Sequence, residues 1–265
     1  MNLKGAVTIV TGSSSGLGAA AAERLAGKGC RVVVNYSKSA DGAEQVAKKC
    51  RAAGSEAIVV KADVADDRDC RRLAQAALDK WGRIDALINN AGTTKFASAA
   101  DLDALDAADF QRIYAVNVIG TYQMTRAVAP AMKKAGHGAV VNVSSIASTR
   151  GSGSSLAYAA SKGALNTLTI GLARSLAPEI RVNAILPGFF DSPWLRGGLG
   201  ESFDQAKARV EASAALGRAG TPEDMAEVAV ALIECADYVT GQLLPVEGGQ
   251  LLAVSAAYRL PGKSR

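Results

Sequence analysis

The amino-acid sequence predicts an α/β fold of one domain, in which helices cover both faces of a seven-stranded, doubly wound parallel sheet. Short apolar runs rich in β-branched residues alternate with longer alanine-rich amphipathic segments, as they do in strand-helix-strand units. Several of these runs are apolar at consecutive positions, which is typical of strands that helices cover on both faces. No linker or repeat interrupts the pattern, so residues 1–265 are interpreted as a single domain.

The expected elements follow one another through short connections. Strands are expected at residues 6–10, 31–35, 57–61, 84–88, 139–143, 181–185 and 243–246. Helices are expected between them at residues 17–27, 41–53, 67–80, 106–134, 157–177 and 222–236. Gly54 after the second helix, and Thr221 followed by Pro222 at the start of the last, are ordinary stop and start signals.

Two segments depart from this alternation. Residues 189–216 hold Pro193 and three glycines among mixed apolar and polar residues, which predicts a mobile lid or a substrate loop. The tail over about residues 250–265 is expected to be partly disordered.

The charge and the composition exclude several classes of protein. The net charge of +5 comes from 30 basic and 25 acidic residues dispersed along the chain, so no nucleic-acid partner is indicated. No stretch is long and apolar enough to span a membrane, and residues 1–5 lead directly into the first strand, without room for a signal peptide.

The cysteines indicate neither a metal site nor a disulfide framework. They are far apart, form no CxxC pair and have no histidine cluster beside them: Cys30, Cys50, Cys70 and Cys235. Free thiols are typical of a reducing compartment, so a cytoplasmic location is expected.

A glycine-rich turn joins the first expected strand to the first helix. The sequence Thr11-Gly-Ser-Ser-Ser-Gly-Leu-Gly18 lies where a tight turn and exposed N–H groups at a helix start can hold a pyrophosphate. The structural alternative is a glycine- and serine-rich loop that only connects two elements. If the turn binds a nucleotide, the expected contacts come from Gly12, Ser14, Ser15, Gly16, Leu17 and Gly18.

Tyr158 and Lys162 stand four residues apart in an expected helix, so both project from one face. A nearby ammonium favours the phenolate and is expected to pull the pKa of the tyrosine down from about 10. Tyr158 can then give a proton to a forming alkoxide or take one from an alcohol. Ser145, at the end of the strand at 139–143, is placed to hydrogen-bond the same substrate oxygen.

Each of these residues also has a purely structural explanation. A YxxxK pattern occurs by chance, Asn117 could bridge backbone groups, and Ser145 could simply end a strand. None of them supplies a hydride, so redox chemistry would require a cofactor at the glycine turn. The only histidine, His137, lies in a Gly-His-Gly turn, and no GxSxG elbow accompanies it, which disfavours a hydrolase.

The motifs together resemble those of the classical short-chain dehydrogenase/reductases over residues 5–250. They occur in that family's order: TGxxxGxG, Asn89-Asn90-Ala91-Gly92, Asn117, Ser145, Tyr158 with Lys162, and Pro187-Gly188. The resemblance implies a Rossmann-type fold and hydride transfer to or from a small carbonyl or alcohol. It assigns catalysis to Asn117, Ser145, Tyr158 and Lys162, with Asn117 holding a water that relays protons to the lysine. The family's interval before the tyrosine favours Ser145 over Ser144.

The end of the second expected strand bears on the choice of cofactor. It carries no acid that would accept from a ribose 2′-OH, and it continues as Asn35, Tyr36, Ser37 and Lys38. Neutral groups and a lysine could hold a 2′-phosphate, so NADP(H) is favoured. NAD(H) stays possible, because Ser15 stands where many NADP-preferring relatives carry a basic residue and because Lys38 could be an ordinary solvated lysine.

The resemblance assigns the remaining cofactor contacts. Asp63 and Val64 would border the adenine, although Asp63 could also belong to a loop or cap a helix. Asn90, Ala91 and Gly92 would pass behind the ribose. The nicotinamide would be bordered by Pro187 and Gly188, with its carboxamide held by Ser192.

The sequence says less about the substrate and the partners than about the cofactor. Residues 94–96, 146–155 and 189–199 should shape the pocket, and they mix small polar groups with Phe189, Phe190, Trp194 and Leu195. This suits a modest, partly apolar carbonyl compound.

The chain is similar to 3-oxoacyl-carrier-protein reductases, and equally to broad carbonyl, polyhydroxyarene or sugar-alcohol members of the family. Two alternative functions stay open: an NAD(H)-linked alcohol, steroid or sugar dehydrogenase, and a nucleotide sensor without chemistry. The resemblance also implies a homotetramer, which is common in the family and packs the helices at 106–134 and 157–177 against partner copies. These helices could equally be buried against the sheet of the same chain.

Overall fold

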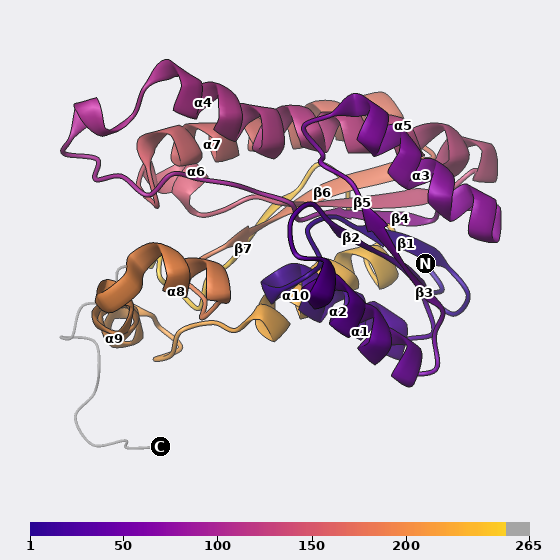
Figure 1. Cartoon of the computed structure of the whole chain (residues 1–265), viewed down its shortest axis with the longest axis horizontal. Coiled ribbons are helices and arrows are strands. Elements are labelled where there is room, and N and C mark those ends of the chain that lie inside the picture. The colour runs from indigo at the N-terminus through magenta and orange to yellow at the C-terminus, as the bar shows by residue number, and fades with distance from the viewer. Residues whose placement is uncertain (253–265) are drawn as a thin grey trace.

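A computed structural model describes residues 1–252 and confirms the predicted fold class. Within these residues a seven-stranded parallel sheet has the order β3-β2-β1-β4-β5-β6-β7 (Figure 1). Its strands are β1 (Val7–Val10), β2 (Arg31–Tyr36), β3 (Ala57–Lys61), β4 (Ala86–Asn89), β5 (Gly138–Val143), β6 (Ile180–Pro187) and β7 (Leu243–Val246).

The first strand, β1, lies inside the sheet, where it pairs with β2 on one side and with the central strand β4 on the other. Every residue of β1, β4 and β5 is buried, as the consecutive apolar positions predicted. The chain builds β2 and β3 outward from β1, then returns to place β4 on the other side. Such a reversal opens a crevice at the carboxyl ends of the strands, where ligands bind in folds of this type.

Helices form a layer on each face of the sheet, as Figure 1 shows. One layer packs its apolar side chains in a cluster with β1, β2 and β5, and it comprises α1 (Gly16–Gly27), α2 (Ala40–Ala52) and α10 (Pro222–Glu234). The helices of the opposite layer are α3 (Asp67–Trp81), α4 (Ala107–Tyr114), α5 (Thr121–Ala135) and α7 (Leu156–Leu176). No helix within residues 1–252 is long and apolar enough to cross a membrane.

Local sequence signals set several of these helix ends. The Asp66 side chain accepts a hydrogen bond from Arg68 N and caps α3, which ends at Gly82 in a left-handed conformation. Thr221 and Asp224 form a reciprocal capping box at the start of α10, with Pro222 in its first turn. These short-range contacts explain why most expected boundaries lie within two residues of the observed ones.

The long helix expected at 106–134 is interrupted by a π-helical turn. Between α4 and α5 the segment η2 (Ala115–Gly120) has π-helical hydrogen bonding, and it contains Asn117. One added residue per turn rotates the side chains that follow, and such turns are frequent at functional sites.

The segment at 189–216, expected to be a loop, contains two helices instead. They are α8 (Pro193–Leu199) and α9 (Phe203–Ser213), joined by the short 3-10 helix η3 (Gly200–Ser202). Ser192 caps α8, and Phe203 is buried where α9 begins. The glycines that suggested a loop lie at the end of α8 and in η3, and in Figure 1 this pair of helices stands apart from both layers.

Two smaller differences remain. A short helix, α6 (Ala147–Arg150), follows β5 and was not expected. Of the tail expected to be disordered, residues 253–265 lie outside the described residues.

Candidate active site

The glycine turn between β1 and α1 is closely packed on one side and open on the other. A Cβ on Gly12 would lie 2.9 Å from Ala91 Cα, and a Cβ on Gly18 would lie 2.6 Å from the Gly12 carbonyl oxygen. Gly16 has φ +56 and would direct a Cβ into open space. The Ser15 side chain makes no capping bond to α1. The turn therefore has the open space and the free helix start that a pyrophosphate requires.

Asn35, expected to contact a cofactor, holds this turn in place. Its side chain is buried; Oδ1 accepts a hydrogen bond from Gly12 N at 3.0 Å, and Nδ2 donates to the carbonyl oxygens of Val60 and Ala62 at 3.2 and 3.1 Å. Ser13 completes the contact, because its Oγ donates to Val10 O at 2.7 Å and accepts from Asn35 N at 2.9 Å. Asn35 is therefore a positioning residue.

A second asparagine joins the glycine turn to the end of β4. The Asn90 side chain donates to the carbonyl oxygens of Thr11 and Gly12, both at 2.9 Å. Thr11 Oγ1 in turn accepts from the backbone N–H groups of Asn90 and Ala91, both at 3.0 Å. Sequence reasoning gave Thr11 no role of its own, although it opens the glycine motif.

The residues after β2 lie beside the glycine turn. Tyr36 is half-buried, and Ser37, Lys38 and Ser39 are exposed. A Cβ on Gly42, in the first turn of α2, would lie 2.7 Å from Ser14 O, so the start of α2 approaches the turn closely. Gly42 was not singled out from the sequence; a glycine in the first turn of a helix was the available signal.

The residues expected to be catalytic meet at the carboxyl ends of β4 and β5. Ser155 caps α7 by accepting a hydrogen bond from Tyr158 N at 3.2 Å. One turn later Lys162 is buried, donates to Val143 O at 2.8 Å and has its Nζ 5.5 Å from the Tyr158 ring centroid. The Ser145 side chain hydrogen-bonds the Tyr158 side chain.

Burial shifts the pKa values of Tyr158 and Lys162. It raises the pKa of Tyr158 to about 12, although the hydrogen bond with Ser145 acts in the opposite direction. Burial also lowers the pKa of Lys162 to about 8. The expectation that the ammonium pulls the tyrosine pKa down is therefore wrong for the chain alone, because desolvation outweighs it and the Lys162 amine bonds the Val143 carbonyl. Tyr158 is a neutral phenol at neutral pH.

Asn117 connects the loop after β4 to α7. Its Oδ1 accepts from Thr93 N at 2.8 Å, and its Nδ2 donates to Thr93 O and to Ser161 Oγ, both at 3.0 Å. The Asn117 side chain is fully buried, and the π-helical turn η2 places it there. These bonds fix the loop that passes Lys162, and the water relay stays a prediction.

The other residues expected at the cofactor lie along the same crevice. Asp63 Oδ1 accepts from Ala65 N at 3.0 Å, the local turn that its structural explanation implied. Val64 is buried and would contact any Cβ added to Gly120 at 2.8 Å. Gly188, which follows Pro187, donates from its N–H to Val246 O at 3.0 Å.

Ser192, expected to hold the carboxamide of the nicotinamide, caps a helix. Its side chain is buried and accepts from Leu195 N at 3.3 Å, which caps α8. Its hydroxyl proton is left for another acceptor, so the two roles are compatible.

Only part of the aromatic set expected in the pocket reaches the tyrosine. Phe189 packs on Phe203 with ring centroids 5.6 Å apart, and Phe190 packs on the core beneath α10. Trp194 lies beside Tyr158, with ring centroids 5.7 Å apart.

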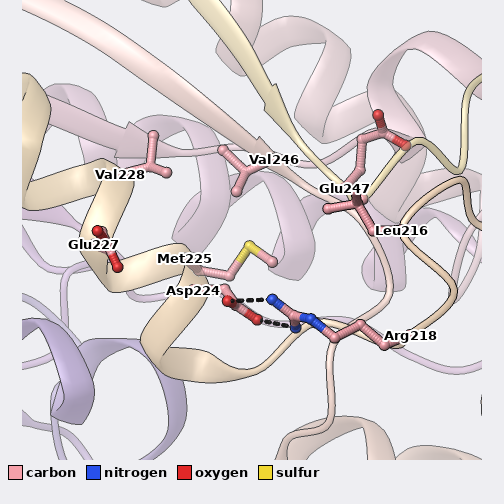
Figure 2. Close-up of a pocket in the computed structure, with 10 residues that line it drawn as sticks. Leu216, Arg218, Asp224, Met225, Glu227, Val228, Val246 and Glu247 are labelled. Carbon is pink, nitrogen blue, oxygen red and sulfur yellow. Dashed lines mark hydrogen bonds and ion pairs between the residues drawn. The ribbon is translucent and has the colours of Figure 1, made fainter. Parts of the chain in front are cut away.

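A separate cavity of about 280 Å³ lies at the start of α10 and holds none of the four catalytic candidates (Figure 2). The Arg218 guanidinium donates two hydrogen bonds to Asp224, at 2.5 and 2.7 Å, and lowers the pKa of that carboxyl to about 2. This pair fixes the segment before α10 to the helix.

We expect Gly18→Ala to weaken NADPH binding by at least about tenfold, because the added methyl group would strike the Gly12 carbonyl and the Asn90 amide and displace the turn. Fluorescence titration with NADPH measures this. Gly27→Ala, in the last turn of the same helix with nothing within 4 Å of the added Cβ, is the matched control. Equal affinity in both variants would contradict the packing argument.

We expect Lys162→Met to remove a rise of stability with pH. Between a pKa of about 8 in the folded chain and 10.5 in the unfolded chain, the folded chain binds fewer protons, so its free energy of unfolding increases with pH. The increase is about 2 kcal/mol between pH 8 and 10, and below pH 8 the contribution is constant. Urea denaturation at several pH values measures it.

The control for this experiment is Lys133→Met, on the exposed face of α5. This variant should follow the unsubstituted chain across the whole range. Parallel profiles for Lys162→Met and the unsubstituted chain would show that Lys162 is not a perturbed base.

Comparisons with known proteins show the family to which the chain belongs. A family profile described as "Enoyl-(Acyl carrier protein) reductase" matches residues 12–250. The chain is 44% identical over 243 residues to "Granaticin polyketide synthase putative ketoacyl reductase 2" of Streptomyces violaceoruber, covering 92% of this chain and 95% of that protein. It is 35% identical over 249 residues to a 3-oxoacyl-[acyl-carrier-protein] reductase of Synechocystis, covering 93% and 97%.

A solved structure has the same fold. It is described as a "putative short-chain dehydrogenase/reductase" from Burkholderia xenovorans, with a TM-score of 0.87 and 44% identity over 94% of this chain and 98% of that one. The glycine turn, the tyrosine and the lysine thus occur in a chain whose relatives are named as dehydrogenases and reductases. The chain belongs to the classical short-chain dehydrogenase/reductase family, NAD(P)-binding oxidoreductases that act on CH–OH or C=O groups.

Proposed function

We propose that the chain reduces a carbonyl group to an alcohol with NADPH, using Tyr158 as the general acid. The observation that carries this proposal is the meeting of Tyr158, Ser145 and Lys162 at the carboxyl end of the sheet, beside the glycine turn. When bound, the cofactor supplies the hydride to the carbonyl carbon.

The side chains would bind the carbonyl oxygen and donate the proton that it takes up. Ser145 and Tyr158 donate hydrogen bonds to the carbonyl oxygen, which gains negative charge as the hydride arrives. Tyr158, whose pKa burial raises to about 12, is protonated at neutral pH, which is the state that a proton donor requires. After the transfer, the Lys162 ammonium, 5.5 Å from the ring, stabilises the phenolate.

The preference for NADPH rests on the residues after β2. Ser37, Lys38 and Ser39 are exposed beside the start of α2, without an acid between residues 35 and 39. A lysine and hydroxyl groups next to a helix N-terminus would attract a 2′-phosphate, whereas an acid there would repel it.

A small ketone or a 3-oxoacyl thioester is the proposed substrate. The names of the relatives at 44% and 35% identity, a ketoacyl reductase and a 3-oxoacyl-carrier-protein reductase, support it. Other relatives support an alcohol, steroid or sugar dehydrogenase as the second candidate. They are 35–36% identical and are named as dehydrogenases of a hydroxycyclohexanecarboxylate, a steroid and L-rhamnose.

A cytoplasmic location belongs to the same proposal. Three of the four cysteines are buried and all are free, including Cys235 on the surface, as expected for a reducing compartment.

We expect Tyr158→Phe to lose turnover by about 100-fold or more, because the variant lacks the proton donor. Its affinity for NADPH should be retained. NADPH oxidation with acetoacetyl thioesters, diketones, quinones and ketoses measures the first property and fluorescence titration the second. Tyr122→Phe, on the exposed face of α5, is the control, and undiminished turnover in Tyr158→Phe would refute the assigned role.

We expect Lys38→Glu to lower kcat/KM for NADPH by about tenfold or more and to change the value for NADH little, because the carboxylate repels only the 2′-phosphate. Lys48→Glu, an exposed site further along α2, is the control for net charge. An equal loss with both cofactors would contradict a phosphate contact.

We expect four chains of 27.1 kDa in light scattering. Large apolar side chains are exposed in the layer of α4, η2, α5 and α7, namely Phe110, Ile119, Tyr122 and Ile170. A tetramer would bury them, and Ile170→Glu should reduce the mass. A monomeric unsubstituted chain would contradict this assembly.

A further inference from the structure

Two aromatic side chains extend from Tyr158 toward solvent. The Trp194 ring lies 5.7 Å from the Tyr158 ring and 5.4 Å from the Phe96 ring, with interplanar angles of 44° and 53°. Trp194 is 42% exposed, although it touches both neighbours. The three rings form a continuous aromatic surface, called here the aromatic wall, which begins at the proton donor.

The Phe96 end of the aromatic wall is fixed to the catalytic helix. Ala97 N donates to Ser154 O at 2.9 Å, and the hydroxyl groups of Thr94 and Ser154 are 2.8 Å apart. Ser154 immediately precedes Ser155, which caps α7. Phe96 therefore keeps its position relative to Tyr158.

The Trp194 end is fixed by α8. Arg196 donates two hydrogen bonds to Asp191, at 2.7 and 2.6 Å, and its guanidinium stacks 4.3 Å from the centroid of the buried Phe203 ring. Gly198 lies against the Phe96 ring so closely that any Cβ there would overlap it. These contacts hold α8 against Phe96 and keep the Trp194 ring beside the Tyr158 ring.

Two charged side chains close in sequence to Phe96 and Trp194 are already paired. Lys95 bonds Asp109 at 2.6 Å, and Arg196 bonds Asp191. The surface that flanks the reacting carbonyl is therefore formed by tilted aromatic rings, and the charges of Lys95 and Arg196 are engaged elsewhere.

We propose that Trp194 and Phe96 select ketones whose carbonyl is carried by a flat aromatic ring system, which stacks on the aromatic wall while its oxygen reaches Ser145 and Tyr158. This inference rests on the proposed carbonyl reduction and narrows its substrate class. Contacts between aromatic rings are favourable beyond the area they bury, whereas a puckered saturated ring covers the same wall poorly.

The test compares 2-tetralone with 2-decalone, which share a bicyclic skeleton and differ in one aromatic ring. In both ketones the carbonyl is unconjugated. We expect the ratio of their kcat/KM values to favour 2-tetralone, to fall about tenfold in Trp194→Leu and to be retained in Trp194→Phe. Trp81→Leu, which removes the only other tryptophan, on α3, is the matched control.

A binding measurement separates this proposal from the proposed function. Trp81→Phe leaves Trp194 as the only tryptophan, so its fluorescence reports on the aromatic wall. Saturable quenching by 2-tetralone but not by 2-decalone supports the aromatic wall, even if neither ketone is reduced and the proposed activity fails. An unchanged kcat/KM ratio in Trp194→Leu, or equal quenching by both ketones, overturns the selection of aromatic ketones and leaves carbonyl reduction standing.

Discussion

The site depends on hydrogen bonds between the glycine turn and two amide side chains, the buried Asn35 and the half-buried Asn90, which hold the turn against the sheet. Asn35 accepts from Gly12 N, and Asn90 donates to the carbonyl oxygens of Thr11 and Gly12. A glycine-rich turn has little side-chain packing of its own, so its shape must be imposed by its neighbours. Because β2 and β4 flank β1, their ends are available to impose it.

A second constraint is the burial of Tyr158 and Lys162 on one face of α7. Burial disfavours the charged form of each group, which raises the pKa of the phenol and lowers that of the amine. The Val143 carbonyl and the Ser145 hydroxyl offset part of this cost. The arrangement costs stability at neutral pH and maintains a proton donor beside a cation, as a general acid in a partly apolar pocket requires.

The helices α8 and α9 shape the pocket, whereas the sheet positions the reacting groups. The sheet edge fixes the reacting groups, whereas α8 carries Trp194 over them and is held by contacts with Phe96 and Phe203. The chemistry therefore rests on rigid elements of the fold. The shape of the pocket depends on a smaller substructure, which contains none of the four candidate catalytic residues.

The sequence by itself determined the strand and helix pattern, the single domain, the glycine turn and the residues Asn117, Ser145, Tyr158 and Lys162. These features depend on local periodicity and on motifs with fixed spacing, which are readable along the chain. Only the tertiary structure decided that Asn35 positions the turn, that Ser192 caps α8, that residues 193–213 are largely helical and that burial raises the pKa of Tyr158. The role of Asn35 and the burial of Tyr158 depend on contacts between segments distant in sequence, and local patterns carry no information about which buried partner a side chain meets. The Ser192 cap and the helices at 193–213 are local, but the glycines and the proline among these residues predicted a loop.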